Sequence, residues 1–201
     1  NTGGNSLIID NSTVSNTAGT STIRFINDAT TNTIQNCTIK GSTTDPVAGI
    51  IFFSTTTGST GNDGNTITAN NITNSADANR PLNAIYSAGT PAKTNSGNTI
   101  SNNNIYNFLN KGTASNGVQL AANNTTWTIS GNSFYETASF APTAAVTYNI
   151  VNVSDPLSTD ISISGNYIGG NAASCVGTWT KTNANTNTFS AIKINTATST
   201  S

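Results

Sequence analysis

The chain has 201 residues, of which 7 % are charged, with a net charge of −1 and no histidine. The seven basic residues are scattered, which excludes a nucleic-acid partner because phosphate neutralisation needs clustered Lys and Arg. No apolar run approaches the ~20 residues of a membrane span, so no membrane-spanning segment is expected.

A short sequence motif, called the phrase below, recurs along the chain and predicts a repeat fold. It consists of an apolar residue, a two-residue step, a small polar residue that is usually Asn, one more residue, and a second apolar residue. Its copies begin at Ile9, Ile34, Ile67, Ile100, Ile129, Ile163 and Phe189. Their spacings of 25, 33, 33, 29, 34 and 26 residues are typical of repeat architectures. A disordered chain has no reason to be periodic.

Each copy of the phrase is expected to contain two short strands around a corner. The flanking residues alternate apolar and polar side chains with period two, which is a strand pattern. A third apolar run follows each copy, at 23–25, 51–53, 85–86, 118–120 and 150–153. Three short strands and three corners per repeat predict an all-β parallel β-helix (a solenoid) of about six to seven coils.

The repeat also predicts a register. The apolar residues that begin the phrase, from Ile9 to Phe189, should form one inward stack with neighbours ~4.8 Å apart. The 33-residue spacing should bring loops 54–65 and 87–98 side by side. Asn suits the corner because it tolerates the left-handed conformation and bonds to the local backbone. The expected amide ladder consists of Asn70, Asn103, Asn132 and Asn166.

The two cysteines are not expected to form a disulfide. Cys37 takes the Asn position of its copy, and Cys175 lies four copies further on. Four strand spacings correspond to roughly 19 Å, whereas a disulfide needs Cα atoms within ~7 Å. Both are therefore expected to be small buried residues.

The sequence Gly165-Asn-Tyr-Ile168-Gly-Gly-Asn171 resembles the repeat motif of a known family. It is similar to the Asn-rich right-handed parallel β-helix repeats of large secreted bacterial surface proteins, which are adhesin-like. The resemblance implies that residues 1–201 are a single right-handed β-helix segment of a longer chain. It further implies a secreted or cell-surface location and export by the host's secretion machinery, through a type IX-like route.

A search for catalytic chemistry yields no candidate. With no His, the commonest general base and metal ligand is missing. Glycoside hydrolysis needs two neighbouring carboxylates, yet no acidic residue falls over another in the repeat alignment, and neither Arg24 nor Arg80 has an acidic column near it. Asp155 and Asp160 share one loop. They could bind calcium weakly, or they could simply be favoured turn residues. We therefore expect no catalytic residue, no metal site and no cofactor, and we predict that the segment is not an enzyme.

Two outward features are candidates for binding. The first is a pair of Thr/Ser ranks beside the inward stack, similar to the Thr-x-Thr arrays of ice-binding solenoids. Its candidate ice-binding residues are Thr66, Thr68, Thr99, Ser101, Thr128, Ser130, Ser162 and Ser164, and the ranks would extend to Thr33, Gln35, Thr188 and Ser190. Such residues are also ordinary outward choices on strands. The second feature is Tyr106, Tyr135 and Tyr167, which either stack on sugar rings or pack on one another.

These observations predict a structural and adhesive β-helix segment. Its expected partners are cell-surface or environmental glycans, bound weakly along one face. One alternative is an ice-binding solenoid that uses the Thr/Ser face. A second alternative is a non-catalytic part of a polysaccharide lyase or hydrolase, because this scaffold also carries such enzymes.

Overall fold

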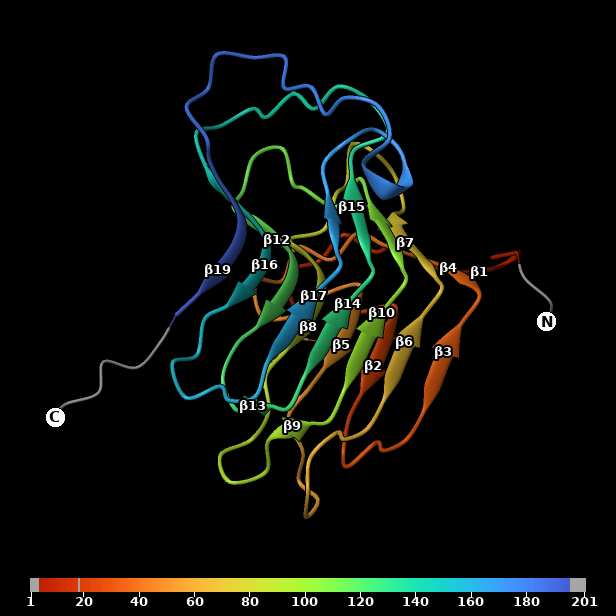
Figure 1. Cartoon of the computed structure of the whole chain (residues 1–201), viewed down its shortest axis with the longest axis vertical. Coiled ribbons are helices and arrows are strands. Elements are labelled where there is room, and N and C mark those ends of the chain that lie inside the picture. The colour runs from red at the N-terminus through yellow and green to blue at the C-terminus, as the bar shows by residue number, and fades with distance from the viewer. Residues whose placement is uncertain (1–3, 18, 196–201) are drawn as a thin grey trace, which may run out of the picture.

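The repeats wind into an all-β parallel solenoid with three parallel sheets, in a computed structural model that describes residues 4–17 and 19–195 (Figure 1). Each strand pairs with the equivalent strands of the turns before and after it, because the repeat returns the chain to the same place once per turn. The predicted fold class is confirmed.

The sheet across the front of Figure 1, called the hydroxyl sheet below, has five strands. They are β3 (Thr33–Gln35), β6 (Thr66–Thr68), β10 (Thr99–Ser101), β14 (Thr128–Ser130) and β17 (Ser162–Ser164). The tyrosine sheet contains β1 (Leu7–Asn11), β4 (Cys37–Gly41), β7 (Asn71–Asn74), β11 (Asn104–Tyr106), β15 (Ser133–Tyr135) and β18 (Tyr167–Ile168).

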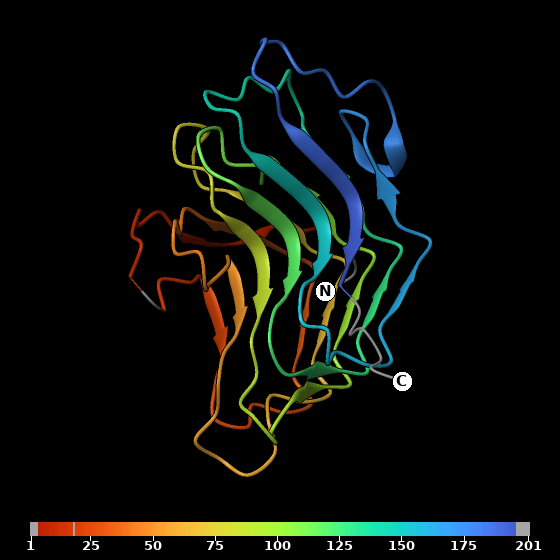
Figure 2. The ribbon, with the colours of Figure 1, turned by 90° about the vertical axis from the view of Figure 1, so that its left-hand side faces the viewer.

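The third sheet faces the viewer in Figure 2, where its strands lie side by side. It consists of β2 (Ile23–Phe25), β5 (Ile51–Phe53), β8 (Asn83–Ser87), β12 (Ser115–Leu120), β16 (Thr147–Val153) and β19 (Thr188–Ile194). Two short strands, β9 (Asn95–Ser96) and β13 (Asn124–Thr125), pair at a corner, and a 3₁₀ turn, η1, spans Ala173–Cys175. No helix in the described ranges has the length and hydrophobicity to cross a membrane.

The predicted inward stack is confirmed in its centre and wrong at both ends. The hydroxyl sheet aligns five isoleucines in consecutive strands, namely Ile34, Ile67, Ile100, Ile129 and Ile163. Ile9 instead pairs with Ile39 in the tyrosine sheet, and Phe189 pairs with Tyr148 in the third sheet. The solenoid therefore has about five turns rather than six to seven. Neither end copy carries the corner Asn: Ser12 and Ile192 take its place.

The predicted amide ladder is confirmed at the corner between the hydroxyl and tyrosine sheets. The Nδ2 of Asn103 donates to the Oδ1 of Asn132 at 2.9 Å and to the carbonyl of Ile67 at 2.9 Å. Its own Oδ1 accepts from the backbone N and the Nδ2 of Asn70, at 3.0 and 3.1 Å. Asn166 continues the ladder beyond Asn132. Cys37 ends it, because its backbone N donates to Asn70 but its thiol supplies no amide.

The left-handed residue of this corner is the one before the ladder Asn, which corrects the prediction. The five residues at that place have φ between 53° and 64°, and they are Asn36, Ala69, Asn102, Gly131 and Gly165. The ladder Asn is thus chosen for its amide bonds alone, and its neighbour carries the conformational requirement.

A second ladder was not predicted. It lies at the other end of the hydroxyl strands, where Asn32, Asn65 and Asn98 bond amide to amide at 2.9 and 3.1 Å. Each again follows a residue of positive φ, as Gly64 precedes Asn65. Trp127 takes the next place; it is fully buried, and its indole N–H donates to a backbone carbonyl at 2.9 Å. An aromatic side chain therefore replaces the amide where this ladder stops.

The left-handed corner residue gives a stability prediction. Ala69 sits at φ 53°, so Ala69→Gly should raise the free energy of unfolding by about 0.5–1 kcal/mol. Gly165→Ala should lower it by about 1 kcal/mol. The added Cβ would meet nothing closer than 3.9 Å, so only the backbone is tested. Urea unfolding of both variants measures the changes in the free energy of unfolding. Changes of the same sign in the two variants would contradict the placement of the left-handed residue.

The predicted contact between loops 54–65 and 87–98 is confirmed. Asn62 and Asn95 bond amide to amide at 3.1 Å, and the backbone N of Ser96 donates to the Oδ1 of Asp63 at 2.8 Å. In the first half of the loops the offset is 34 residues, so Thr56 rather than Thr57 lies against Thr90. The loops therefore stack as predicted, with the register of their first half shifted by one residue.

Both cysteines are free, as predicted. Cys37 is half-buried, but Cys175 is exposed, so its predicted burial is wrong. The reason is local: Cys175 ends η1, in a long excursion between β18 and β19 rather than in a strand that faces the core. The continuous core consists instead of the inward columns of Ile, Val, Phe and Leu from the three sheets.

Candidate functional site

A cluster of charges is the most unusual feature of this sparsely charged chain. The sequence has seven basic and eight acidic residues, and two of each meet at one corner, between the tyrosine sheet and the third sheet. Asp77 and Arg80 lie between β7 and β8, Lys111 lies between β11 and β12, and Glu136 directly follows β15. Three successive turns thus contribute to one charged cluster.

Arg80 is the centre of the charged cluster. Its Nη1 contacts the Oε2 of Glu136 at 2.5 Å, and its Nε and Nη2 donate to the Oδ1 of Asp77 at 2.9 and 2.7 Å. The Nζ of Lys111 donates to the other oxygen of Asp77. Arg80 is 6 % exposed and Glu136 is completely buried, whereas the side chain of Asp77 is 64 % exposed. The cluster therefore runs from the core to the surface.

Burial dominates the electrostatics at the inner end. It raises the pKa of Glu136 to about 7, although Arg80 opposes the shift by its charge and its hydrogen bond. Burial also raises the pKa of Tyr148 to about 12, and the charge of Glu136 adds to this effect. At the surface the hydrogen bond from Lys111, helped by Arg80, lowers the pKa of Asp77.

The charged cluster corrects an expectation from the sequence. No acidic residue was expected near Arg80, yet Asp77 and Glu136 both contact it. The alignment followed the first strand of each repeat, whereas these residues lie in corner loops, and the loop that begins with Glu136 has eleven residues against eight in the two loops before it. One signal was available: Glu136 follows Tyr135 at the place where Asn107 follows Tyr106, so an acid replaces an amide in that column.

Two hollows flank the charged cluster. The polar hollow has a volume of about 260 Å³ and is lined by Asp77, Ala78, Arg80, Asn110, Lys111, Gly112 and Thr143. The apolar hollow has about 270 Å³ and is lined by Leu109, Phe140, Tyr148, Trp179, Lys181, Asn187 and Phe189. The two adjoin at Phe140, whose ring lies 5.4 Å from the Arg80 guanidinium.

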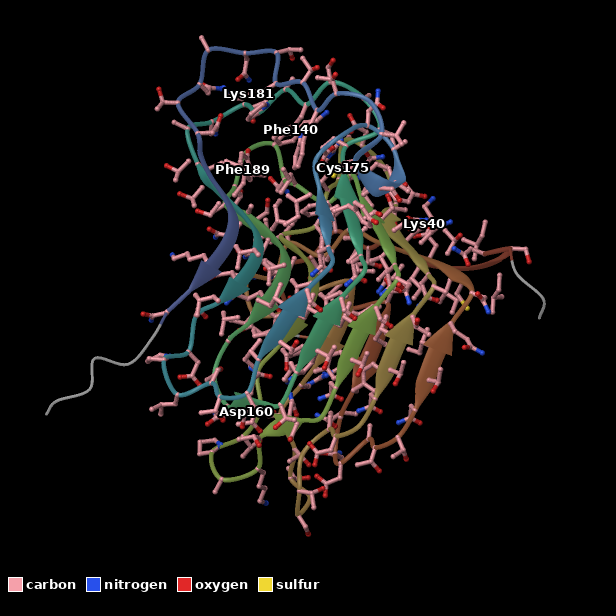
Figure 3. All side chains as sticks on the ribbon, viewed as in Figure 1. Lys40, Phe140, Asp160, Cys175, Lys181 and Phe189 are labelled. Atoms are coloured by element: carbon pink, nitrogen blue, oxygen red, sulfur yellow. The ribbon has the colours of Figure 1, made fainter. Side chains whose placement is uncertain are left out.

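The apolar hollow is an opening in the core beneath two paired loops. The backbone N of Phe140 donates to the carbonyl of Thr180 at 2.8 Å, which joins the loop after β15 to the loop before β19. Figure 3 shows Phe140, Lys181 and Phe189 at this end of the molecule. Among the described residues, none hydrogen-bonds to the buried hydroxyl of Tyr148.

The three candidate tyrosines do not form one platform. Tyr106 and Tyr135 are paired across strands and stack on each other, with ring centroids 5.2 Å apart and planes at 17°. The alternative that they pack on one another is thus confirmed for this pair. Tyr167 lies opposite Ser133 and is 46 % exposed. Of the three it offers the most exposed side chain to a ligand, and its role in glycan binding stays a prediction.

The two hydroxyl ranks are in register, as the sequence predicts. One rank contains Thr33, Thr66, Thr99, Thr128 and Ser162, and the other contains Gln35, Thr68, Ser101, Ser130 and Ser164. The extension to Thr188 and Ser190 is wrong, because both lie in β19 of the third sheet. Within the second rank, the Oγ of Ser101 donates to the Oγ1 of Thr68 at 3.0 Å.

Two further acids, Asp155 and Asp10, take structural positions. Asp155 accepts from the backbone N of Asn123 at 2.8 Å and of Leu157 at 2.9 Å, so it fits the turn alternative. Asp10 pairs with Lys40, at 3.6 Å, in the tyrosine sheet. The described part of the chain contains no group of three or more His, Cys, Asp or Glu side chains that could hold a metal ion.

Comparisons of this chain with family models, with curated proteins and with solved structures gave no match. A parallel solenoid by itself names no function, since one scaffold can carry many unrelated sites.

Proposed function

We propose that this chain is a structural and adhesive segment of a secreted or cell-surface bacterial protein that binds glycans weakly. The observation that carries this proposal is the pair of buried amide ladders on a three-sheet parallel solenoid. Because each ladder Asn bonds to the turns on both sides, neighbouring turns cannot slide or separate without leaving buried polar groups unsatisfied. Such a stack is suited to hold adhesive surfaces at a fixed spacing.

The same proposal includes the family resemblance. On that basis the solenoid is right-handed, forms part of a longer surface protein, and is exported through a type IX-like route. It also includes the absence of catalysis. Asp77, the exposed acid of the charged cluster, has its oxygens occupied by Arg80 and Lys111, and Glu136 is sealed behind Arg80. This arrangement supports a binding role over an acid–base pair.

Binding to glycans should be weak at each contact and stronger by repetition. We expect the purified segment to bind immobilised neutral polysaccharides with an affinity that changes less than twofold between ~0.05 and ~0.5 M salt, because the chain has few charges to be screened. Surface plasmon resonance measures this directly. A tenfold loss over that range would contradict the binding mode, and cleavage of the polysaccharide would contradict the absence of catalysis.

Ice binding is a second candidate, favoured by the in-register hydroxyl ranks. Strand pairing repeats the hydroxyls about every 4.8 Å along each rank, a regular array that could order surface water. Thermal hysteresis distinguishes the two functions. The adhesive proposal expects none, whereas hysteresis that Thr99→Tyr abolishes would favour the ice-binding alternative.

A further inference from the structure

We propose that the polar hollow is a binding subsite for one neutral sugar residue with vicinal hydroxyls. This inference rests on the proposed function and names the place where a glycan is held. It moves the main contact away from Tyr106 and Tyr135, whose rings stack on each other. The hollow is formed in the middle of the solenoid by turns that carry complete neighbours on both sides.

The first argument is energetic. A buried ion pair is costly to desolvate, and apolar residues of similar volume are often as stable or more so. The other corners of this solenoid are joined by neutral asparagine amides at no such cost. Only at this corner are an arginine and a glutamate buried together. The need to link neighbouring turns therefore does not explain why a buried ion pair is present here. Fixing the guanidinium of Arg80 at the wall of a hollow does account for it.

The second argument is the set of groups that line the hollow. Asp77 presents a 64 % exposed carboxylate, which accepts, and Lys111 presents a 32 % exposed ammonium, which donates. Asp77 and Lys111 bond to each other, but about one of the four acceptor sites of Asp77 and two of the three N–H donors of Lys111 remain free of the bonds to Arg80 and to each other. Of two adjacent sugar hydroxyls, one can donate to Asp77 and the other can accept from Lys111, and both bonds are charge-assisted.

The rim of the hollow is held in place by its own backbone bonds. The amide of Asn110 donates to the carbonyl of Arg80 at 2.7 Å and accepts from the N–H groups of Gly112 and Thr113 at 3.0 Å. The backbone N of Thr143 donates to the carbonyl of Lys111 at 2.7 Å. These bonds fix the loops from three turns around the hollow, so the groups that would meet a sugar are positioned before it arrives.

The net charge of the cluster and the volume of the hollow both restrict the ligand. When Glu136 is ionised, above pH 7, two basic and two acidic side chains balance within the charged cluster, so an ionised ligand would then add an uncompensated charge. A volume of about 260 Å³ lies just below the ~300–1,000 Å³ of typical ligand sites, which suits one ring rather than an oligomer. Both points favour a single neutral residue of a longer glycan.

The test uses four matched variants. Asp77→Asn and Lys111→Met alter the hollow, while Asp10→Asn and Lys40→Met alter the other exposed Asp–Lys pair, at 3.6 Å in the tyrosine sheet. Methyl glycosides of common neutral hexoses are titrated into ¹⁵N-labelled protein. We expect shifts at the amides of Gly112, Thr113 and Thr143. The affinity should fall at least tenfold in each hollow variant and less than twofold in each control variant.

The outcomes separate this inference from the proposed function. If the segment binds polysaccharide but the amides around the hollow do not shift, or the control variants lose as much affinity as the hollow variants, the subsite is wrong and the adhesive function stands. If neither polysaccharides nor hexosides bind, the adhesive function fails as well. Preferential shifts by uronic acids would overturn the assignment to a neutral sugar.

Discussion

Replacing Arg80 with methionine should lower the free energy of unfolding by about 3–5 kcal/mol at pH 8, because it leaves the carboxylate of Glu136 buried without its partner. At pH 5 the loss should be less than half as large, since Glu136 then takes up a proton and no charge is stranded. Urea unfolding at the two pH values measures the difference. An equal loss at both would show that the variant suffers from packing against Phe140 and not from an unpaired charge.

The wild-type protein should show the matching pH dependence. Folding raises the pKa of Glu136 from 4.5 to about 7, so the folded state binds the proton more tightly than the unfolded state. The resulting stability is fully present below pH 4.5 and is lost as the pH rises through 7, by about 3 kcal/mol. A double variant, Arg80→Met with Glu136→Leu, should remove this dependence and return to within about 1 kcal/mol of the wild type at pH 8.

The repeating part of the fold could be predicted from the sequence because its physical requirements repeat. Ile67, Ile100 and Ile129 begin phrases whose corner repeats a left-handed residue followed by a ladder Asn, so alignment in sequence became alignment in space. The prediction failed at the two end copies, which lack the corner Asn, although the copy with Cys37 at that place kept the predicted register. Ile9 and Phe189 match the apolar pattern, but period-two alternation fits any of the three sheets equally well, and they joined the other two.

The charged cluster could not be predicted because nothing in it repeats. Asp77, Arg80, Lys111 and Glu136 occur once each in corner loops, of which the first two have eight residues and the loop that begins with Glu136 has eleven. Whether these side chains contact one another depends on the path of each loop between its two strands. The spacing of the phrase does not determine that path. Glu136 takes the place that Asn107 has in the preceding turn, and this local sign depends on the register of the tyrosine sheet.

Replacing Asn103 with alanine should lower the free energy of unfolding by about 3 kcal/mol, one of the two largest effects expected here. The change removes four ladder bonds in a fully buried place. It leaves the backbone N–H of Asn70 without its partner. It also removes one bond each from the Nδ2 of Asn70, which keeps its bond to Ile34, and from the carbonyl of Ile67. Each buried group left unsatisfied costs ~1–3 kcal/mol, and partial relaxation of the corner keeps the total below the sum.

Asn104 is the matched control, because it is the next residue and carries the same side chain. Its Nδ2 also donates a hydrogen bond to the side-chain amide oxygen of Asn71, at 3.1 Å. That bond lies on the half-buried outer face of the tyrosine sheet, where water replaces it, so Asn104→Ala should cost less than about 0.5 kcal/mol. Asn103→Asp sharpens the comparison. It keeps the acceptor but turns the donor toward the Oδ1 of Asn132 into a second acceptor, and it should cost more than alanine above pH 5. Equal losses at positions 103 and 104 would mean that the ladder is an ordinary hydrated turn, and the stiffness on which the adhesive proposal depends would lose its support.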